Sequence, residues 1–174
     1  FLRKKDAITF IHHDNPYLMN ISQGLNLISY GTEDDLYVNG RITGNSPYLA
    51  FEWKAGKDGE RHQVRTQLIG EYNFPNAWLH HYRTFFGVEA KKIDEALAEY
   101  TPQNNRSQLK KTEDNTLIID AYNANPTSMM AALQNFQNMT VPHKMLILGD
   151  MRELGADSPA EHQKIVGYIK ESDF

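Results

Sequence analysis

The chain has 174 residues, no cysteine and a formal net charge of -4. Without cysteine it can form no disulfide, no thiolate nucleophile and no cysteine-based zinc site. The charge gives no electrostatic footprint for nucleic acid, which requires a clustered excess of Lys and Arg. No apolar run approaches the roughly 20 residues of a membrane span, and no signal-peptide pattern is present. We therefore expect a globular cytoplasmic protein of one domain or two small ones.

The N-terminal part of the chain is patterned for strands. Alternating apolar and polar residues, or short apolar runs between Gly and Pro turns, predict five of them. They are residues 7–11, 25–30, 36–39, 48–54 and 62–68. Between the first two, Asn15 and Pro16 have the residue types of a helix cap and a first helical residue, and Gly24 ends that short helix. Gly40 is expected to end the third strand.

Two helices are predicted next, over residues 74–86 and 91–99, with Asn73 as a candidate cap of the first. Aromatic and histidine side chains share one side of that first helix: Phe74, Trp78, His81, Tyr82 and Phe85. An aromatic stripe at this spacing is more often part of a core than of a cofactor site. The pairs His12-His13 and His80-His81 lack a carboxylate at a known metal-ligand spacing, so we interpret them as structural or solvated.

The polar, aperiodic stretch Thr101–Ser107 predicts a domain boundary. A hairpin of residues 108–111 with 115–120 is expected after it, followed by a helix that begins at Pro126 with Asn125 as its cap. Residues 144–148 form a second short apolar run, which we expect to be a buried strand parallel and adjacent to residues 117–119. This β-α-β-α order is typical of the beginning of a doubly wound parallel fold.

The last predicted helix has the signature of a capping box, with Ser158 as the cap, Pro159 in the first helical position and Glu161 three residues after the cap. The chain starts without Met and stops just after this amphipathic helix. We therefore expect it to be a piece of a longer protein.

The polar turn that follows residues 117–119 is the first candidate site. Ligands of an open parallel sheet collect outside the carboxyl ends of its strands, where helix N-termini present unpaired N–H groups. Asp120 opens this turn, and its carboxylate is suited to accept hydrogen bonds from a ligand. Asp, Asn and Pro are also ordinary turn-formers, so Asp120 could instead tie down the loop through its own backbone.

Three separated motifs resemble those of the Mur ligases, which build the peptide of bacterial cell-wall precursors. They are Gly70–Ala77, similar to the family's Gly-x-His-Asn-x-x-Asn-Ala, then Asp120–Ser128, and Gly149–Gly155 followed by Ser158 and His162. The second and third are similar to the branch of the family that adds D-alanyl-D-alanine. Tyr72 stands where the family usually has His, and Asn104-Asn105-Arg106 replaces the common Pro-Gly-Arg.

The resemblance implies an α/β fold in two parts. Residues 1–104 would be the tail of a Mur ligase central ATPase domain, mixed α/β with antiparallel strands. Residues 105–174 would be an incomplete Rossmann-like C-terminal domain. The phosphate loop and the metal ligands would lie before Phe1. By this resemblance we expect no catalytic residue and no metal ligand within the chain, and we expect the chain alone to be inactive.

The resemblance also implies the chemistry of the intact parent. ATP with Mg²⁺ phosphorylates the carboxylate of UDP-N-acetylmuramoyl-tripeptide, and the amine of D-alanyl-D-alanine attacks the acyl-phosphate. The nucleotide-binding residues would be Asn73 and Asn76 near the adenine, with Arg106 and with Asp120 at the ribose. An amide side chain suits a purine edge because it offers both a donor and an acceptor. The residues expected near the phosphates or the dipeptide are Tyr122, Asn123, Asn125, Ser128, Asp150 and Met151.

Two rival interpretations stay open. One is another ATP-dependent amide ligase of the same fold, either a different Mur ligase or a folylpolyglutamate synthase. The other is a non-catalytic nucleotide-binding or interaction module built on half of a Rossmann-like domain. A Gly-Lys-[Thr/Ser] loop encoded upstream would favour the ligase over the module.

Overall fold

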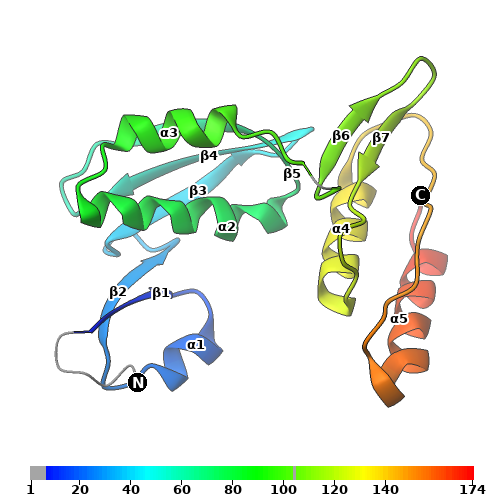
Figure 1. The fold of residues 1–174 in the computed structure, drawn as a ribbon, viewed down its shortest axis with the longest axis horizontal. Coiled ribbons are helices and arrows are strands. Elements are labelled where there is room, and N and C mark those ends of the chain that lie inside the picture. The colour runs from blue at the N-terminus through cyan, green and yellow to red at the C-terminus, as the bar shows by residue number, and fades with distance from the viewer. Residues whose placement is uncertain (1–6, 104) are drawn as a thin grey trace.

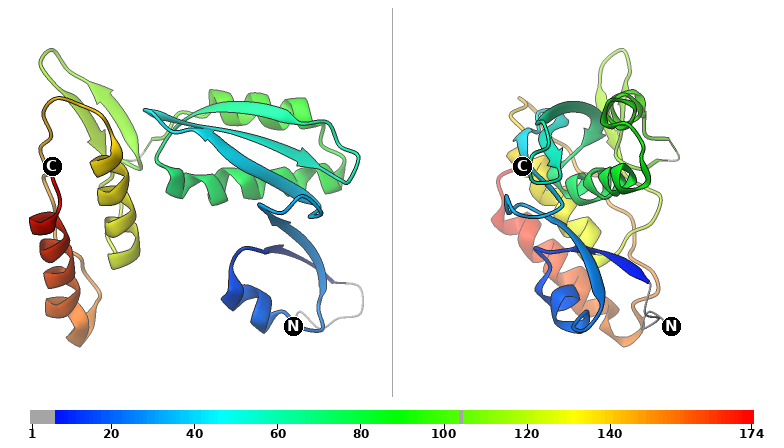
Figure 2. Two further views of the ribbon diagram at one scale, coloured as in Figure 1. Left: turned by 180° about the vertical axis from the view of Figure 1, so that it is seen from behind. Right: turned by 90° about the vertical axis from the view of Figure 1, so that its left-hand side faces the viewer.

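The fold is taken from a computed structural model that describes residues 7–103 and 105–174, without the side chains of residues 79–82. The expected boundary residue Asn104 and the expected core side chains of His81 and Tyr82 lie outside the described residues. Two units stand side by side, and both views agree on this (Figures 1 and 2). We call residues 8–99 the N-terminal unit, residues 108–174 the C-terminal unit, and residues 100–103 and 105–107 the linker between α3 (Ala90–Glu99) and β6 (Gln108–Lys111).

A five-stranded mixed sheet organises the N-terminal unit, with its strands in chain order. They are β1 (Ile8–His12), β2 (Asn26–Gly31), β3 (Val38–Gly44), β4 (Tyr48–Ala55) and β5 (His62–Ile69). The first three run parallel, and β4 and β5 continue the sheet antiparallel. Helix α1 (Pro16–Ile21) connects β1 to β2, and the Asn15 side chain accepts hydrogen bonds from the Tyr17 and Leu18 N–H groups, as predicted.

Strand β3 shows why one predicted boundary was wrong. The strand does not end at Gly40 but continues to Gly44. A Cβ atom at Gly40 would lie 2.4 Å from the main-chain oxygen of Glu52, so only glycine allows the two backbones this close. Here glycine marks a close approach inside the sheet and not a turn.

The core of this unit lies between the sheet and two helical segments. Alternation along β4 and β5 buries Leu49, Phe51, Trp53 and Val64. Helix α2 (Phe74–Leu79), the 3₁₀ helix η2 (His80–Phe86) and helix α3 (Ala90–Glu99) cover that face (Figure 1). The predicted stripe is only partly internal, because Phe74 and Trp78 are buried whereas Phe85 is 38% exposed.

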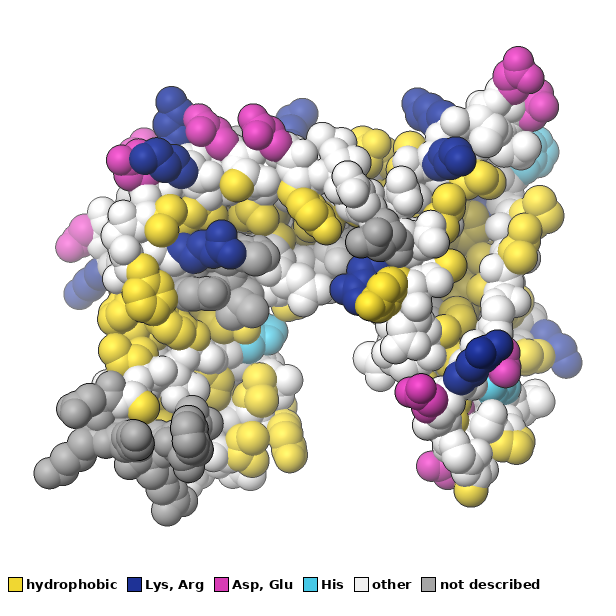
Figure 3. Space-filling view, viewed as in Figure 1, with side chains coloured by type: hydrophobic (Ala, Val, Ile, Leu, Met, Phe, Trp, Pro, Cys, Tyr) yellow, Lys and Arg dark blue, Asp and Glu magenta, His cyan; other side chains and the backbone are white. Residues whose placement is uncertain are grey.

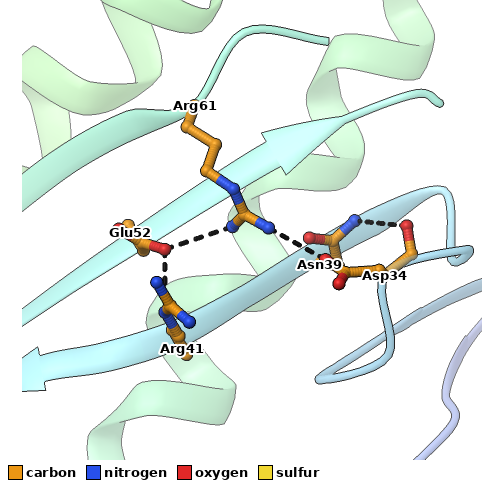
Figure 4. A network of polar contacts seen from close by, with 5 residues as sticks. All are labelled: Asp34, Asn39, Arg41, Glu52 and Arg61. Atoms are coloured by element: carbon orange, nitrogen blue, oxygen red, sulfur yellow. Dashed lines mark hydrogen bonds and ion pairs between the residues drawn. The ribbon is translucent and has the colours of Figure 1, made fainter. Parts of the chain in front are cut away.

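The opposite face of the sheet carries a polar network (Figure 4). Glu52 is 9% exposed, and its carboxylate receives the Arg41 guanidinium at 2.8 Å and the Arg61 guanidinium at 3.2 Å. Arg61 also pairs with Asp34 at 2.8 Å, and the Asn39 amide donates to the Asp34 carbonyl oxygen. Two guanidinium groups compensate one nearly buried carboxylate, and the network joins β3, β4, the residue before β5 and the loop before β3.

The C-terminal unit consists of a hairpin and two helices. Strands β6 (Gln108–Lys111) and β7 (Thr116–Ile119) pair antiparallel, as predicted. Helices α4 (Pro126–Asn138) and α5 (Ser158–Glu171) pack around a small cluster whose buried members are Leu133, Met151 and Ile165. No helix in the part of the chain described is long and apolar enough to span a membrane.

The predicted strand at residues 144–148 is absent, and so is its expected parallel pairing with residues 117–119. In the described residues β7 pairs only with β6, and residues 144–148 have no strand assignment. Leu146 packs toward the cluster, but Met145 and Ile147 are 76% and 86% exposed. A strand needs a neighbour for its main-chain hydrogen bonds, and no described segment provides one here.

Helix starts were predicted unequally well. Asn125 caps α4 in a capping box with Ser128, and Pro126 occupies the first turn, as predicted. The capping box predicted at Ser158 is wrong. A 3₁₀ turn, η3 (Gly155–Asp157), leads directly into α5, so Asp157 occupies the cap position with helical backbone angles and no side-chain cap bond.

Candidate functional site

A cleft of about 550 Å³ lies beside the junction of the two units. It is lined by residues of β5, η1 (Glu71–Asn73), α2, η2, α3 and the linker: Leu68, Asn73, Asn76, Ala77, Arg83, Val88, Lys92, Ile93, Ala96, Leu97, Tyr100, Pro102, Arg106 and Ser107. Three of the predicted nucleotide-binding residues, Asn73, Asn76 and Arg106, therefore line one cleft. The fourth, Asp120, is bonded to Ser107 in its wall.

The lining of this cleft combines apolar and cationic groups. Its buried members include Ile93 and Leu97 of α3. Arg83, Lys92 and Arg106 contribute three cations, and the lining includes no Asp or Glu. An apolar recess with a few positive groups suits a ligand that has a flat apolar part and an anionic part.

Asn73 does not cap α2 as the sequence suggested. It ends η1, and its amide nitrogen donates to the Ile69 carbonyl oxygen at 2.8 Å and to the Ser107 hydroxyl at 3.3 Å. Gly70, with φ of 92°, makes this turn possible, since a Cβ atom there would lie 2.4 Å from Cε1 of the Tyr72 ring. With both N–H groups of Asn73 engaged, its amide oxygen is the atom left to accept from a ligand.

Asp120 joins the two units. It directly follows β7, and its Oδ1 accepts from the Ser107 main-chain N–H at 3.3 Å. Its Oδ2 accepts from the Tyr72 hydroxyl at 3.0 Å. Both oxygens are therefore held, yet the residue stays exposed to solvent.

The protonated phenol of Tyr72 determines which group donates in each of these hydrogen bonds. Burial is the main cause that raises the pKa of Tyr72 to about 12, and the charge of Asp120 raises it further, although hydrogen bonds from Ser107 and Asn73 oppose the shift. The phenol thus stays protonated near neutral pH and donates a hydrogen bond to Asp120. The Ser107 hydroxyl, 2.7 Å from the Tyr72 oxygen, must then be the donor in that contact.

The linker that carries Arg106 has an unusual backbone. Asn105 and Ser107 have φ of 58° and 45°, a region that residues other than glycine rarely adopt. The Ala121 N–H donates to the Asn105 carbonyl oxygen at 2.7 Å, which ties the linker to the turn after β7. The Arg106 guanidinium lies 3.7 Å from the centre of the Tyr122 ring, a cation–π contact that also borders a second hollow of about 660 Å³.

The residues expected at the phosphates or the dipeptide divide into two groups. The first group consists of Tyr122, Asn123 and Asn125 in the turn before α4, with Ser128 in the first turn of that helix. Asn125 and Ser128 bond each other's main chains as a capping box, whereas Tyr122 is 61% exposed. Because an α-helix starts here, unpaired N–H groups gather beside these side chains.

Asp150 and Met151 lie apart from that turn, near the start of α5. The Met151 side chain is 2% exposed and packs within the cluster of the C-terminal unit. Its N–H donates to Nε2 of His162 at 3.0 Å, and the Asp150 carboxylate lies 2.7 Å from the same nitrogen. His162 also contacts the Ser158 carbonyl oxygen through Nδ1 at 2.7 Å, which fixes the ring.

Sequence reasoning missed two members of this site, Tyr72 and Ser107. Tyr72 was notable only as a departure from a family motif, and Ser107 only as part of a polar linker. Neither position carries a local signal, because their contact depends on how the two units meet. In residues 7–103 and 105–174, no three His, Asp or Glu side chains group so as to hold a metal ion.

The chain is similar in sequence to known ligases. Residues 105–174 match the family model "Mur ligase, glutamate ligase domain". The UDP-N-acetylmuramoyl-tripeptide--D-alanyl-D-alanine ligase of Bacillus subtilis is 28% identical over 162 residues, which are 87% of this chain and 33% of that protein. The chain thus spans about a third of the length of this curated relative.

Solved structures share the fold. MurF from Acinetobacter baumannii superposes with a TM-score of 0.81 at 24% identity, over 97% of this chain and 37% of that one. The MurF ligase of Thermotoga maritima, solved in complex with ADP, gives a TM-score of 0.77 at 19% identity, over 98% of this chain and 39% of that one. The described part of the chain therefore has a mixed α/β fold, with a five-stranded mixed sheet, that matches part of MurF. Residues 105–174 therefore belong to the Mur ligase family, and the chain as a whole is similar to ligases of the MurF type.

Proposed function

We propose that this chain supplies part of the nucleotide site of an ATP-dependent amide ligase. The ligase would join D-alanyl-D-alanine to UDP-N-acetylmuramoyl-tripeptide through an acyl-phosphate, in the synthesis of cell-wall peptidoglycan in the cytoplasm. The observation that carries the proposal is the cleft at the junction of the two units. Asn73, Asn76 and Arg106 line it, and Asp120 is tied to its wall.

The side chains of this cleft fit an adenine nucleotide. The recess formed by Ile93 and Leu97 suits the face of a purine, and the free oxygen of Asn73 can accept from an exocyclic amino group. The Asp120 carboxylate can accept from ribose hydroxyls, since each of its oxygens retains a lone pair. Arg83 and Arg106 would offset phosphate charge.

Mg²⁺ does not fit the described residues in the same way. They include no suitable group of three acidic or histidine side chains, so no step of the reaction is assigned to a metal held by this chain. The chemistry of the parent requires stabilisation of charge on the transferred phosphoryl group and exclusion of water from the mixed anhydride. The role we assign to this chain is to bind and orient the adenosine end of ATP.

We also propose the division of labour between the two units. Residues 1–104 would be the end of the central ATP-binding domain, and residues 105–174 the beginning of a Rossmann-like C-terminal domain. The turn with Tyr122 and Asn123 would face the phosphates or the incoming dipeptide, next to the N-terminus of α4. Asp150 would approach the same substrates from the start of α5.

The proposal is tested by titrating the isotope-labelled 174-residue chain with ADP and following amide NMR shifts. The expected result is saturable shifts at Asn73, Asn76, Arg106 and Asp120. Asn76→Ala should weaken binding about tenfold, because one hydrogen bond and its contacts are lost. Asn138→Ala, at the far end of α4, is the matched control and should leave binding unchanged. Shifts confined to other residues, or no saturable shift at millimolar ADP, would contradict the proposal.

A further inference from the structure

Four polar side chains form one chain of hydrogen bonds across the linker. The Asn73 amide lies 3.3 Å from the Ser107 hydroxyl, which lies 2.7 Å from the Tyr72 hydroxyl. The Tyr72 hydroxyl lies 3.0 Å from Oδ2 of Asp120. The Ser107 main-chain N–H donates to Oδ1 of Asp120 at 3.3 Å, so these hydrogen bonds form a closed ring. This series of hydrogen bonds therefore connects Asn73 in the cleft to the Asp120 carboxylate, which follows β7.

Each hydrogen bond in this series is donated in the direction from Asn73 towards Asp120. An amide nitrogen only donates, so the Asn73 side chain donates a hydrogen bond to the Ser107 oxygen. The Asp120 carboxylate only accepts, so the Tyr72 hydroxyl donates the hydrogen bond between them. The remaining contact must then run from Ser107 to Tyr72. Ser107 is 5% exposed, so its hydroxyl has few alternative partners in solvent.

We propose that Tyr72 and Ser107 are positioning residues for Asp120 at the nucleotide site, an inference that rests on the function proposed above. The side chain of an exposed aspartate at a turn samples several rotamers. Here one bond to each carboxylate oxygen fixes both the position and the plane of the group. One lone pair on each oxygen stays available, which is the arrangement a ribose with two hydroxyls requires.

The positioning role differs measurably from a purely structural clasp between the units. A clasp would affect thermal stability and leave the affinity of a correctly folded chain for a nucleotide unchanged. Positioning couples Tyr72 to Asp120 in ligand binding. Removal of the Tyr72 hydroxyl then weakens binding only while Asp120 is present to be positioned.

The experiment compares the native chain with Tyr72→Phe, Asp120→Asn and the double variant. Tyr72→Phe keeps the ring and removes only the hydroxyl. Tyr17→Phe is the matched control, because Tyr17 is 70% exposed on α1. Hydrogen exchange of the Ser107 amide measures how firmly the carboxylate is held. The internal reference is the Ala121 amide, which follows β7 and bonds the Asn105 carbonyl oxygen of the linker. Calorimetric titration with ADP measures affinity.

The expected result has two parts. Tyr72→Phe should speed exchange of the Ser107 amide about fivefold and leave the Ala121 amide unchanged. It should weaken ADP binding about fivefold, whereas Asp120→Asn weakens it about ten- to a hundredfold and the double variant no further.

Three results would overturn the inference. Unchanged exchange at Ser107 in Tyr72→Phe would show that the carboxylate is held without the phenol. Weaker ADP binding in Asp120→Asn but not in Tyr72→Phe would remove the positioning role and leave the proposed function intact. If neither variant changes ADP affinity, Asp120 lies outside the nucleotide site, and the positioning role fails together with that part of the proposed function.

Discussion

The two units of this chain contain similar apolar runs that end in different structures. In the N-terminal unit, Leu49, Phe51 and Trp53 of β4 are 0% exposed between β3, β5 and the helices. In the C-terminal unit, Met145 and Ile147 are 76% and 86% exposed on a segment without strand partners in the described residues. Figure 3 shows apolar side chains on the surface of that unit.

The difference teaches that neighbours decide whether an apolar run becomes a strand. β4 has a hydrogen-bonded partner on each side and helices over its apolar face. Residues 144–148 have a helical cluster on one side only, reached by Leu146. The two units also have separate clusters, with Trp78 in one and Leu133 in the other. We therefore expect a substitution in the core of one unit to reduce the stability of that unit and to leave the other unchanged.

The largest effect should follow from Phe51→Ala. Phe51 of β4 is 0% exposed and packs against the Phe74 ring, and truncation of such a side chain typically reduces the free energy of unfolding by about 3–5 kcal/mol. Both tryptophans belong to the N-terminal unit, so tryptophan fluorescence during urea unfolding reports on it alone. Phe86→Ala, at a site 66% exposed, is the control. An equal loss measured by NMR in the C-terminal unit would show that the cores are not independent.

Most of the N-terminal fold could be predicted from the sequence because its signals are local. The alternation in β5 and the cap at Asn15 act within a few residues, and both were predicted. The continuation of β3 past Gly40 could not be predicted, because it depends on the approach of Glu52 from another strand. The missing strand at residues 144–148 depends likewise on partners that a local pattern does not specify.

The candidate site divides in the same way. Resemblance to the Mur ligase motifs suggested Asn73, Asn76 and Arg106, and the structure gathers them in one cleft. The contacts of Tyr72 with Ser107 and Asp120 span 35 and 48 residues, so no periodicity could reveal them. The sequence thus supplied candidates for ligand contacts but not the groups that orient them.

The second-largest effect tests the exposed run directly. Leu133→Ala should reduce the free energy of unfolding of the C-terminal unit by about 2–4 kcal/mol, because Leu133 is 2% exposed at the centre of its small cluster. Ile147→Ala removes a similar volume from a side chain that is 86% exposed, and should change it by less than about 0.5 kcal/mol. Equal losses in the two variants, measured by hydrogen exchange in α5, would mean that residues 144–148 are packed in solution.

A smaller effect concerns the junction of the units. The folded pKa of Tyr72 is raised from 10.0 to about 12, so its contribution to stability is complete below pH 10 and is lost as the pH rises through 12. The melting temperature of the native chain should therefore fall more steeply between these pH values than that of Tyr72→Phe. Tyr30, whose pKa burial also raises, is present in both chains and cancels in the difference. Parallel curves from differential scanning fluorimetry would contradict the burial of the phenol.

The smallest effect on stability is expected from removing the asparagine helix cap that each unit contains. Asn125→Ala removes the acceptor for the Ser128 N–H and should cost about 1 kcal/mol of stability, because α4 carries Leu133 into the cluster. Asn15→Ala removes the equivalent acceptor from α1, a helix of 6 residues with none buried, so the loss should stay within that helix and leave the unit's unfolding midpoint unchanged. Urea midpoints measured separately for the two units test both statements. A lowered midpoint in Asn15→Ala would show that α1 unfolds together with the sheet, and an unchanged one in Asn125→Ala would leave ligand binding as the reason for that residue.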